Sequence, residues 1–152
     1  MTRLLGIDLG RRRIGIAVSD EAGGSARPLA TIARGRNVEQ DAAVLSRLAA
    51  EQRAGELVVG LPLTLGGRLG TQADETTAWA DRIRTLTGLP VSLRDERLTT
   101  ARAGERIGPA RRGRAGGPPS AERRRARSAR LDREAATLIL QAEIDARRAA
   151  TS

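Results

Sequence analysis

The sequence predicts an α/β fold in which helices cover both faces of a mixed five-stranded sheet, three strands antiparallel and then two parallel. Three apolar stretches lie within the first 33 residues and are joined by short links, as in an antiparallel meander. Two later apolar stretches each follow a helical pattern, and right-handed crossovers would place them parallel to the first strand. The 152 residues can bury one core, so we expect a single domain over residues 1–152.

Short apolar runs that end at turn residues indicate the five strands. The first run ends at Gly10 and the fourth at Pro62. The expected strands are residues 4–9, 14–19, 29–33, 56–61 and 91–94.

Four segments carry helical patterns. The first begins at the N-cap Asn37, with Gln40 three residues on, an approximate capping box. The second is expected to be capped by Thr71 and to end at Gly88. The last two are expected at residues 99–107 and about 129–148. The stripes expected to be buried are Val38, Ala42, Leu45, Leu48 and Ala49 in the first helix, and Thr76, Trp79, Ile83 and Leu86 in the second.

The composition excludes several kinds of chemistry. The chain has no His, Cys or Tyr, so it has no imidazole base, thiolate nucleophile or disulfide. Clustered acids that hold a divalent cation are the remaining means of cleaving an inert bond. No apolar run approaches the length of a membrane span and the N-terminus lacks a signal-peptide pattern, so we expect a cytoplasmic protein that does not enter a membrane.

Positive charge is concentrated in one segment. All 27 basic residues are Arg, a bias typical of a GC-rich genome. Residues 108–130 hold eight of them and one acid, and so supply seven of the nine net positive charges. This segment is rich in Gly and Pro, so we expect a mobile basic loop, able to become helical near residues 120–130. Phosphate binding is favoured over a merely solvated loop.

Carboxylates come from three distant segments that suit a metal site. Asp8 ends the first strand, and the small Gly6 and Gly10 leave room around it. Asp95 and Glu96 follow the fifth strand, at the sheet edge where α/β folds bind ligands. If strand five is two places from strand one, the backbones are about 10 Å apart, which favours the longer Glu96 over Asp95.

Asp132 is expected in the first turn of the last helix, near the same edge of the sheet. The alternatives are a surface turn for Asp8 and macrodipole stabilisation for Asp132. Two Mg²⁺ ions about 4 Å apart could be bridged by such a cluster.

Four blocks of sequence resemble the YqgF/RuvX family, in register from about residue 4 to 144. They are IDLG with RIGIAVSD at 7–20, VVGLPL at 58–63, DERLTT at 95–100, and LD, AA and LILQ within 131–141. The resemblance implies a ribonuclease H-like fold, related to Holliday-junction resolvases. The family is generally described as a nuclease that matures the 5′ end of pre-16S rRNA, with junction resolution as the competing activity.

Carried over residue by residue, the resemblance implies that Asp8, Glu96 and Asp132 are the catalytic and metal-binding acids, with Mg²⁺ or Mn²⁺, in two ions, as cofactor. The ions would lower the pKa of a bound water and stabilise charge on the phosphate. The family usually has a hydroxyl residue where Arg11 stands, and an Asn and an acid near Thr64 and Gly66.

Several arginines are expected to bind substrate. Arg11, Arg12 and Arg13 directly follow the first strand and could clamp a phosphate, with a solvated hairpin as the alternative. The other expected contacts are Arg97, Thr99, Arg111, Arg112, Arg114, Arg123, Arg124 and Arg125. Thr99 is also expected to be an N-cap.

The near absence of aromatic residues shapes the expected substrate. One Trp, expected in the core, leaves no platform on which unpaired bases could stack. Recognition should therefore rest on phosphate and shape, which suits structured RNA and branched DNA equally. The partner is then pre-16S rRNA, with the small-subunit precursor, or a DNA junction, and the protein a monomer or a homodimer.

Two other functions stay open. The first is a sugar-kinase-type ATPase, since Asp8-Leu9-Gly10 after a strand also resembles the phosphate motif of that superfamily. Such enzymes need a second domain, for which 152 residues leave little room. The second is a non-catalytic rRNA-binding assembly factor that uses the basic loop.

Overall fold

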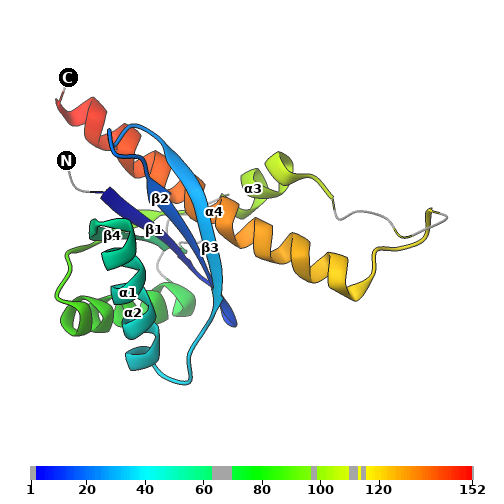
Figure 1. Cartoon of the computed structure of the whole chain (residues 1–152), viewed down its shortest axis with the longest axis horizontal. Helices are drawn as coiled ribbons and strands as arrows, with labels where there is room; N and C mark the ends of the chain where they lie inside the picture. Colours follow the sequence, from blue (N-terminus) through cyan, green and yellow to red (C-terminus); the bar gives the residue numbers. More distant parts are fainter. Residues whose placement is uncertain (1–2, 63–69, 97–98, 110–112, 114–115, 152) are drawn as a thin grey trace.

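The computed structural model describes residues 3–62, 70–96, 99–109, 113 and 116–151. Its strands are β1 (Arg3–Leu9), β2 (Arg13–Ser19), β3 (Ala26–Ala33), β4 (Ala54–Leu61) and β5 (Val91–Asp95). Its helices are α1 (Val38–Gln52), α2 (Thr71–Thr87), α3 (Thr99–Ile107) and α4 (Ala121–Thr151). The five strands form one sheet in the order β3-β2-β1-β4-β5 (Figure 1).

The pairing of the strands confirms the predicted mixed sheet. β1 pairs antiparallel with β2, and β2 antiparallel with β3. β4 is parallel to β1, and β5 is parallel to β4, so β5 lies two places from β1. The carboxyl ends of β1, β4 and β5 therefore meet at one edge of the sheet.

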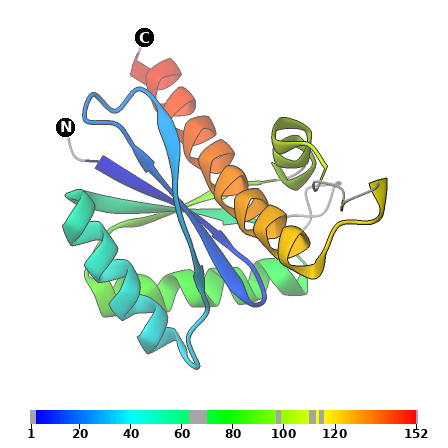
Figure 2. The ribbon, with the colours of Figure 1, turned by 45° about the vertical axis from the view of Figure 1, so that its right-hand side comes forward.

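Side chains of different size cover the two faces of the sheet. Large aliphatic residues such as Ile7, Ile16 and Val59 pack with α1 and α2 on one face. Small residues such as Gly6 and Ala17 lie on the other face, under α4. Figure 2 shows α4 crossing one face while α1 and α2 lie across the other. Helices thus cover both faces, as predicted.

The capping of α1 agrees with the sequence. Asn37 is the N-cap, and its side chain accepts a hydrogen bond from the Gln40 N–H. The Gln40 side chain in turn accepts from the Arg36 N–H, one residue before the cap. Ala42, Leu45 and Ala49 are buried, with Val38 and Leu48 packed beside them. The predicted start and stripe of this helix are confirmed.

Two details of α2 differ from the prediction. Its N-cap is Gly70, which offers no side-chain hydrogen bond, and Thr71 is the first helical residue. Leu86 is 39% exposed because the buried stripe of α2 ends at Ile83, one turn earlier. The helix ends at Gly88 in the left-handed conformation, as predicted.

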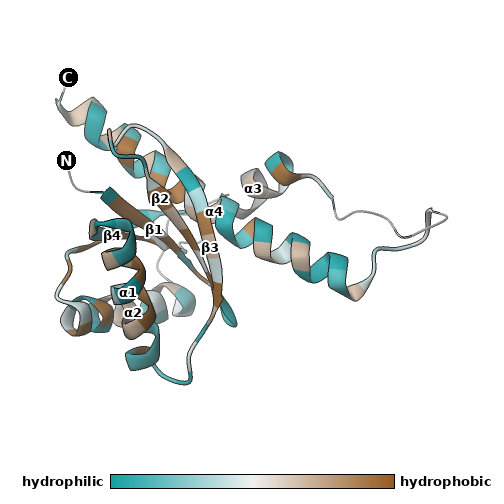
Figure 3. Cartoon of the chain, viewed as in Figure 1, coloured by the Kyte–Doolittle hydropathy of each residue, from teal (hydrophilic) through white to brown (hydrophobic). Residues whose placement is uncertain are grey.

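The last helix is longer than the sequence pattern suggested. α4 begins at Ala121 after Ser120, whose hydroxyl accepts from the Arg123 N–H, rather than at about residue 129. Its first turns project beyond the sheet (Figure 1), and they are largely hydrophilic (Figure 3). Arg, Ala and Glu are strong helix formers, and a helix already packed at its other end extends cheaply. The expected loop at 108–130 is therefore helical from Ala121 onward.

Among the residues with a described position, no helix is long and apolar enough to cross a membrane.

Candidate active site

Gly15 brings α4 against the end of β1. Asp8 and Gly15 are paired across β1 and β2. A Cβ atom on Gly15 would overlap the backbone carbonyl of Asp132, so only glycine allows this approach. Asp132 lies in the middle of the 31-residue α4, not in its first turn as predicted. A macrodipole role for Asp132 is thereby excluded, because the dipole acts within the first turn.

Gly6 and Gly10 serve the fold rather than a ligand. A Cβ on Gly6 would lie 2.7 Å from Leu140 Cβ and 2.8 Å from the Ala136 carbonyl oxygen. A Cβ on Gly10 would lie 2.8 Å from the Arg13 carbonyl oxygen, within the β1–β2 hairpin. The room that we expected around Asp8 is thus filled by α4 and by the turn.

Gly60 lets Glu96 reach Asp8. Gly60 lies in β4, the strand between β1 and β5, and is paired with Arg94. A Cβ on Gly60 would lie 2.6 Å from Glu96 Oε2, so the Glu96 carboxyl lies directly over this glycine. Glu96 and Asp8 share a side-chain hydrogen bond. The gap of two strands, about 10 Å between backbones, is bridged in this way.

The backbone fixes where Glu96 begins. Its N–H donates to the Leu61 carbonyl at the end of β4, at 3.2 Å, and so continues the β4–β5 ladder by one residue. Asp95, one residue earlier, is exposed. The two neighbouring acids are therefore directed differently, and Glu96 is the one that faces Asp8.

Burial makes Asp8 and Glu96 hold protons unusually strongly. Burial raises the pKa of Asp8 to about 6, the hydrogen bond from Glu96 opposes this rise, and the charge of Asp132 adds to it. Burial, the Asp8 charge, the bond to Asp8 and the nearby Asp95 raise the pKa of Glu96 to about 9. At neutral pH the pair therefore shares a proton, as two close carboxylates do.

Asp132 forms a hydrogen-bonded ion pair with Arg13. The Arg13 Nε donates to Asp132 Oδ2 at 2.6 Å. The Asp132 charge still reaches Asp8, whose pKa it raises. Within the described part of the chain, no three acidic side chains are gathered closely enough to hold an ion as they stand. Asp132 would have to exchange Arg13 for a cation to join the other two acids.

The three acids fit a divalent cation by their chemistry. Carboxylate oxygens are the ligands that Mg²⁺ and Mn²⁺ prefer. The pKa values of Asp8 and Glu96 are raised first by burial and then by neighbouring negative charge, and a cation would offset both effects as a proton does. Gly60 also leaves the space that the Glu96 carboxyl occupies.

The predicted substrate contacts that the structure describes lie in two places, the β1–β2 hairpin and the start of α4. Arg11 and Arg12 are exposed in the β1–β2 hairpin, and Arg13 is directed to Asp132. Arg123, Arg124 and Arg125 are exposed in the first turns of α4. Arg97, Arg111, Arg112 and Arg114 lie outside the described residues, as does the Thr99 side chain, although Thr99 begins α3.

Sequence reasoning missed two residues near this edge. Asp41 is 2% exposed, and its carboxylate accepts hydrogen bonds from Trp79 Nε1 at 3.1 Å and from the Gly35 N–H at 2.7 Å. Arg34 has its Nε 3.9 Å from the same carboxylate and donates through Nη1 to the Gly10 carbonyl. The sequence did contain one sign that Asp41 is buried, because this acid directly precedes Ala42 in the predicted buried stripe of α1. The predicted place of Trp79 in the core is confirmed.

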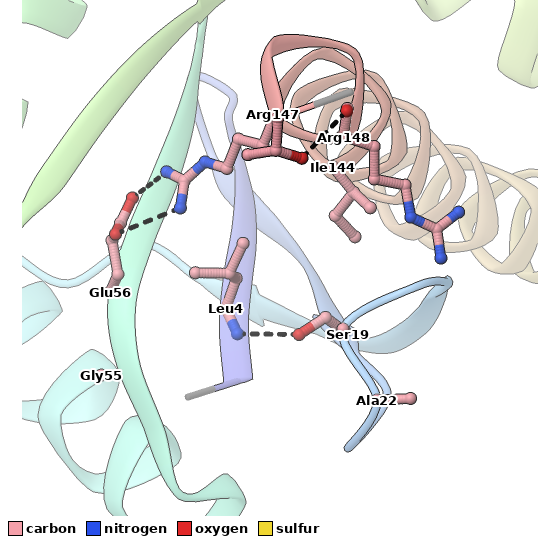
Figure 4. A pocket seen from close by; sticks show the side chains of 10 residues that line it. Leu4, Ser19, Ala22, Gly55, Glu56, Ile144, Arg147 and Arg148 are labelled. Carbon is pink, nitrogen blue, oxygen red and sulfur yellow. Dashed lines mark hydrogen bonds and ion pairs between the residues drawn. The ribbon is translucent and has the colours of Figure 1, made fainter. Parts of the chain in front are cut away.

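A cavity at the opposite end of the sheet holds a structural ion-pair network (Figure 4). It measures about 480 Å³, and Leu4 and Ile144 contribute to its lining. Arg147 pairs with Glu56 and with Glu143, which ties the end of α4 to β4. These acids are therefore engaged far from Asp8.

Two named proteins are similar to nearly the whole of this chain. A Moorella thermoacetica protein named "Putative pre-16S rRNA nuclease" is 42% identical over 143 residues, which cover 94% of each chain. An Anaeromyxobacter sp. protein of the same name is 42% identical over 97% of this chain and 99% of its own.

Among solved structures, Thermus thermophilus RuvC in complex with a Holliday junction substrate has a TM-score of 0.55 and 16% identity. The match covers 98% of this chain and 97% of that one, and it shows the ribonuclease H-like fold. Residues 2–146 match the RuvX family, which is described as Holliday junction resolvase. The chain therefore belongs to the RuvX family.

Proposed function

We propose that this protein is a metal-dependent nuclease that hydrolyses phosphodiester bonds in the 5′ leader of pre-16S rRNA. The observation that carries the proposal is the approach of the Glu96 carboxyl across Gly60 to Asp8, with the Asp132 carboxylate near enough to raise the pKa of Asp8. Three acids that repel one another at the carboxyl edge of a sheet are costly to maintain unless a cation or substrate uses them.

The three acids hold the metal in this proposal. Mg²⁺ or Mn²⁺, in two ions, would supply an activated water and offset charge that develops on the phosphate. Asp8 and Glu96 would hold the cation in their ionised forms, without the proton that they share at neutral pH. Asp132 would hold the cation in place of Arg13, and the Arg13 guanidinium would then be available to bind phosphate oxygens. Because the chain has no His, a carboxylate or the solvent must take the proton released during hydrolysis.

Positive charge near the site supports a nucleic-acid substrate. Arg11 and Arg12 are exposed in the hairpin that follows Asp8, and the exposed Arg123, Arg124 and Arg125 lie on the projecting part of α4. One tryptophan, buried in the core, leaves no stacking surface for bases. Recognition by phosphate and shape follows, which suits folded RNA.

Precursor rRNA is preferred over a DNA junction because the similar proteins carry the rRNA name. The partner of this protein is then the small-subunit precursor, and the protein works in the cytoplasm. The family description and the RuvC-like fold keep a four-way junction as the second candidate substrate.

Cleavage of end-labelled substrates tests the proposal. A pre-16S 5′-leader RNA and a four-way DNA junction are each incubated with wild type or Asp8→Asn, with Mg²⁺, Mn²⁺ or chelator. We expect wild type to cut the RNA faster than the junction, only with metal, and Asp8→Asn to bind but not to cut. Faster cutting of the junction would select the second candidate. Metal-independent binding without cleavage by wild type would overturn the proposal in favour of an assembly factor.

A further inference from the structure

We infer that the cleft between the β1–β2 hairpin and the start of α2 is a second phosphate subsite, in which Arg34 and Arg11 hold a phosphodiester next to the one that is cut. This inference rests on the proposed function, because it assigns the cleft to the same nucleic-acid strand. Arg34 is the new element, since neither the sequence motifs nor the carboxylate site involves it.

The cleft has a defined lining. Its volume is about 440 Å³, and it is lined by Leu9, Gly10, Arg11, Arg34, Thr71, Gln72, Glu75 and Thr76. The lining residues carry two positive charges, on Arg11 and Arg34, and one negative charge, on Glu75. Thr71, which is exposed at the start of α2, also lies in this lining, and its hydroxyl group can donate to a phosphate oxygen.

Arg34 is held at the cleft by the surrounding structure. Its backbone N–H donates to the Arg12 carbonyl at 2.9 Å, which joins the residue to the hairpin. Its Nη1 donates to the Gly10 carbonyl at 3.2 Å, and its side chain is 33% exposed. A guanidinium has five N–H donors, and the bond to Gly10 uses one of them.

The buried Asp41 forms an ion pair with Arg34 and restrains its direction. The Asp41 carboxylate already accepts the Trp79 and Gly35 hydrogen bonds, and Arg34 Nε lies 3.9 Å away, beyond hydrogen-bond length. Asp41 therefore restrains the direction of the guanidinium, as supporting residues do for a binding group.

The cleft and the carboxylates lie on opposite sides of the end of β1. Successive strand residues point to opposite faces, so Asp8 faces α4 while Leu9, which lines the cleft, faces the side of α1 and α2. Gly10 and Arg11 form the rim between the two sites. A nucleic-acid backbone that crosses this rim would place one phosphate at the carboxylates and a neighbouring phosphate in the cleft.

The test measures the affinity of each variant for the leader RNA in the Asp8→Asn background with chelator, so that cleavage does not enter. We expect Arg34→Gln to raise Kd about threefold to tenfold and to reduce the salt slope by about 1. Arg34→Lys keeps the positive charge next to Asp41, so its Kd should lie between that of the protein with Arg34 and that of the Arg34→Gln variant. Glu75→Gln, on exposed α2 surface, should lower Kd. The controls are Arg47→Gln and Glu51→Gln, an exposed pair on α1 that should leave Kd unchanged.

A second arm locates the contact along the RNA. Single phosphates are replaced in turn by neutral methylphosphonates. At one or two positions near the cut, the replacement should weaken binding of the protein with Arg34 and leave the Arg34→Gln variant unaffected. Unchanged Kd in both Arg34→Gln and Glu75→Gln, or an Arg34 effect that is equal at all positions, would overturn the inference.

A third arm separates an RNA phosphate from a free anion. If inorganic phosphate raises the melting temperature only when Arg34 is present, and no RNA position depends on Arg34, the cleft binds a free anion and the inference fails. Failure of this inference can be told apart from failure of the proposed function. If wild type cuts neither substrate, the nuclease proposal fails while the methylphosphonate map still decides the subsite.

Discussion

The Asp132 carbonyl of α4 lies in the space that a Cβ atom on Gly15 would occupy. Because Gly15 is paired with Asp8 across the two strands, this contact sets how close Asp132 comes to Asp8. The distance between two of the three acids is thus controlled by a residue with no functional group.

Gly15→Ala should therefore damage activity and stability together. The new methyl group would overlap the α4 backbone, which cannot rotate away as a side chain can. We expect a loss of about 1–3 kcal/mol in the free energy of unfolding and loss of most cleavage activity. Urea denaturation and the cleavage assay measure the two effects. Gly104→Ala is the control, since among the described residues its Cβ would meet Arg127 Nη2 at an ordinary contact distance of 3.7 Å. Equal behaviour of the two variants would contradict the role of Gly15.

Gly60→Ala should separate the Glu96 contact from the packing of the helix. A methyl group there would lie 2.6 Å from Glu96 Oε2 and 2.5 Å from Ile139 Cδ1. Ile139→Val removes that Cδ1 atom, so the double variant should regain stability, measured by thermal unfolding. It should not regain cleavage, because Glu96 stays displaced from Asp8. Recovery of cleavage in the double variant would show that the position of Glu96 does not matter.

The stability of the metal-free protein should fall as pH rises. Asp8 has an ordinary pKa of 3.8 and a folded value of about 6, and Glu96 has 4.5 and about 9. Between about pH 4 and pH 9 the folded state binds more protons than the unfolded state, so raising the pH favours unfolding. The total loss is on the order of a few kcal/mol.

Urea denaturation in chelator at pH 5, 7 and 9 measures this effect. Glu96→Gln should be more stable than wild type at pH 9 and should flatten the dependence. The exposed Glu51→Gln serves as its control. A wild-type stability that rises from pH 5 to pH 9 would contradict the shared proton.

The arginines of α4 should differ by their direction around the helix. Arg125 is seven residues before Asp132, two turns away on the same face, whereas Arg123 is nine residues before it and on the opposite face. We expect Arg125→Gln to reduce the salt slope of RNA binding by about 1 and Arg123→Gln to change it little. Equal slopes for the two variants would mean that the RNA does not follow the face of Asp132.

The strand order and the meeting of Glu96 with Asp8 could be predicted from sequence because both follow local patterns. Asp8 ends an apolar run, and the need to span two strands favoured Glu96 over Asp95. The roles of Gly15 and Gly60 could not be predicted, since they depend on which helix lies over each strand. The roles of Arg34 and Asp41 could not be predicted for the same reason. Their polar contacts join distant segments, and such contacts leave no repeating pattern in the sequence.

The length of α4 was underestimated for a different reason. The density of Arg before residue 131 suggested that too little apolar surface was present to order the chain. The prediction neglected that a helix packed over its C-terminal half has already been nucleated. Ser120 after Pro118 and Pro119 was the available sign of its start.

The most direct test of the account is to measure Mn²⁺ binding to the purified protein by calorimetry in buffers of different ionisation enthalpy at pH 7.5. If Asp8, Glu96 and Asp132 form one site, wild type should bind Mn²⁺ with release of about one proton. Asp8→Asn, Glu96→Gln and Asp132→Asn should each lose the binding, while Asp145→Asn, elsewhere on α4, should retain it. Equal affinity in wild type and in the three variants, without proton release, would contradict the account.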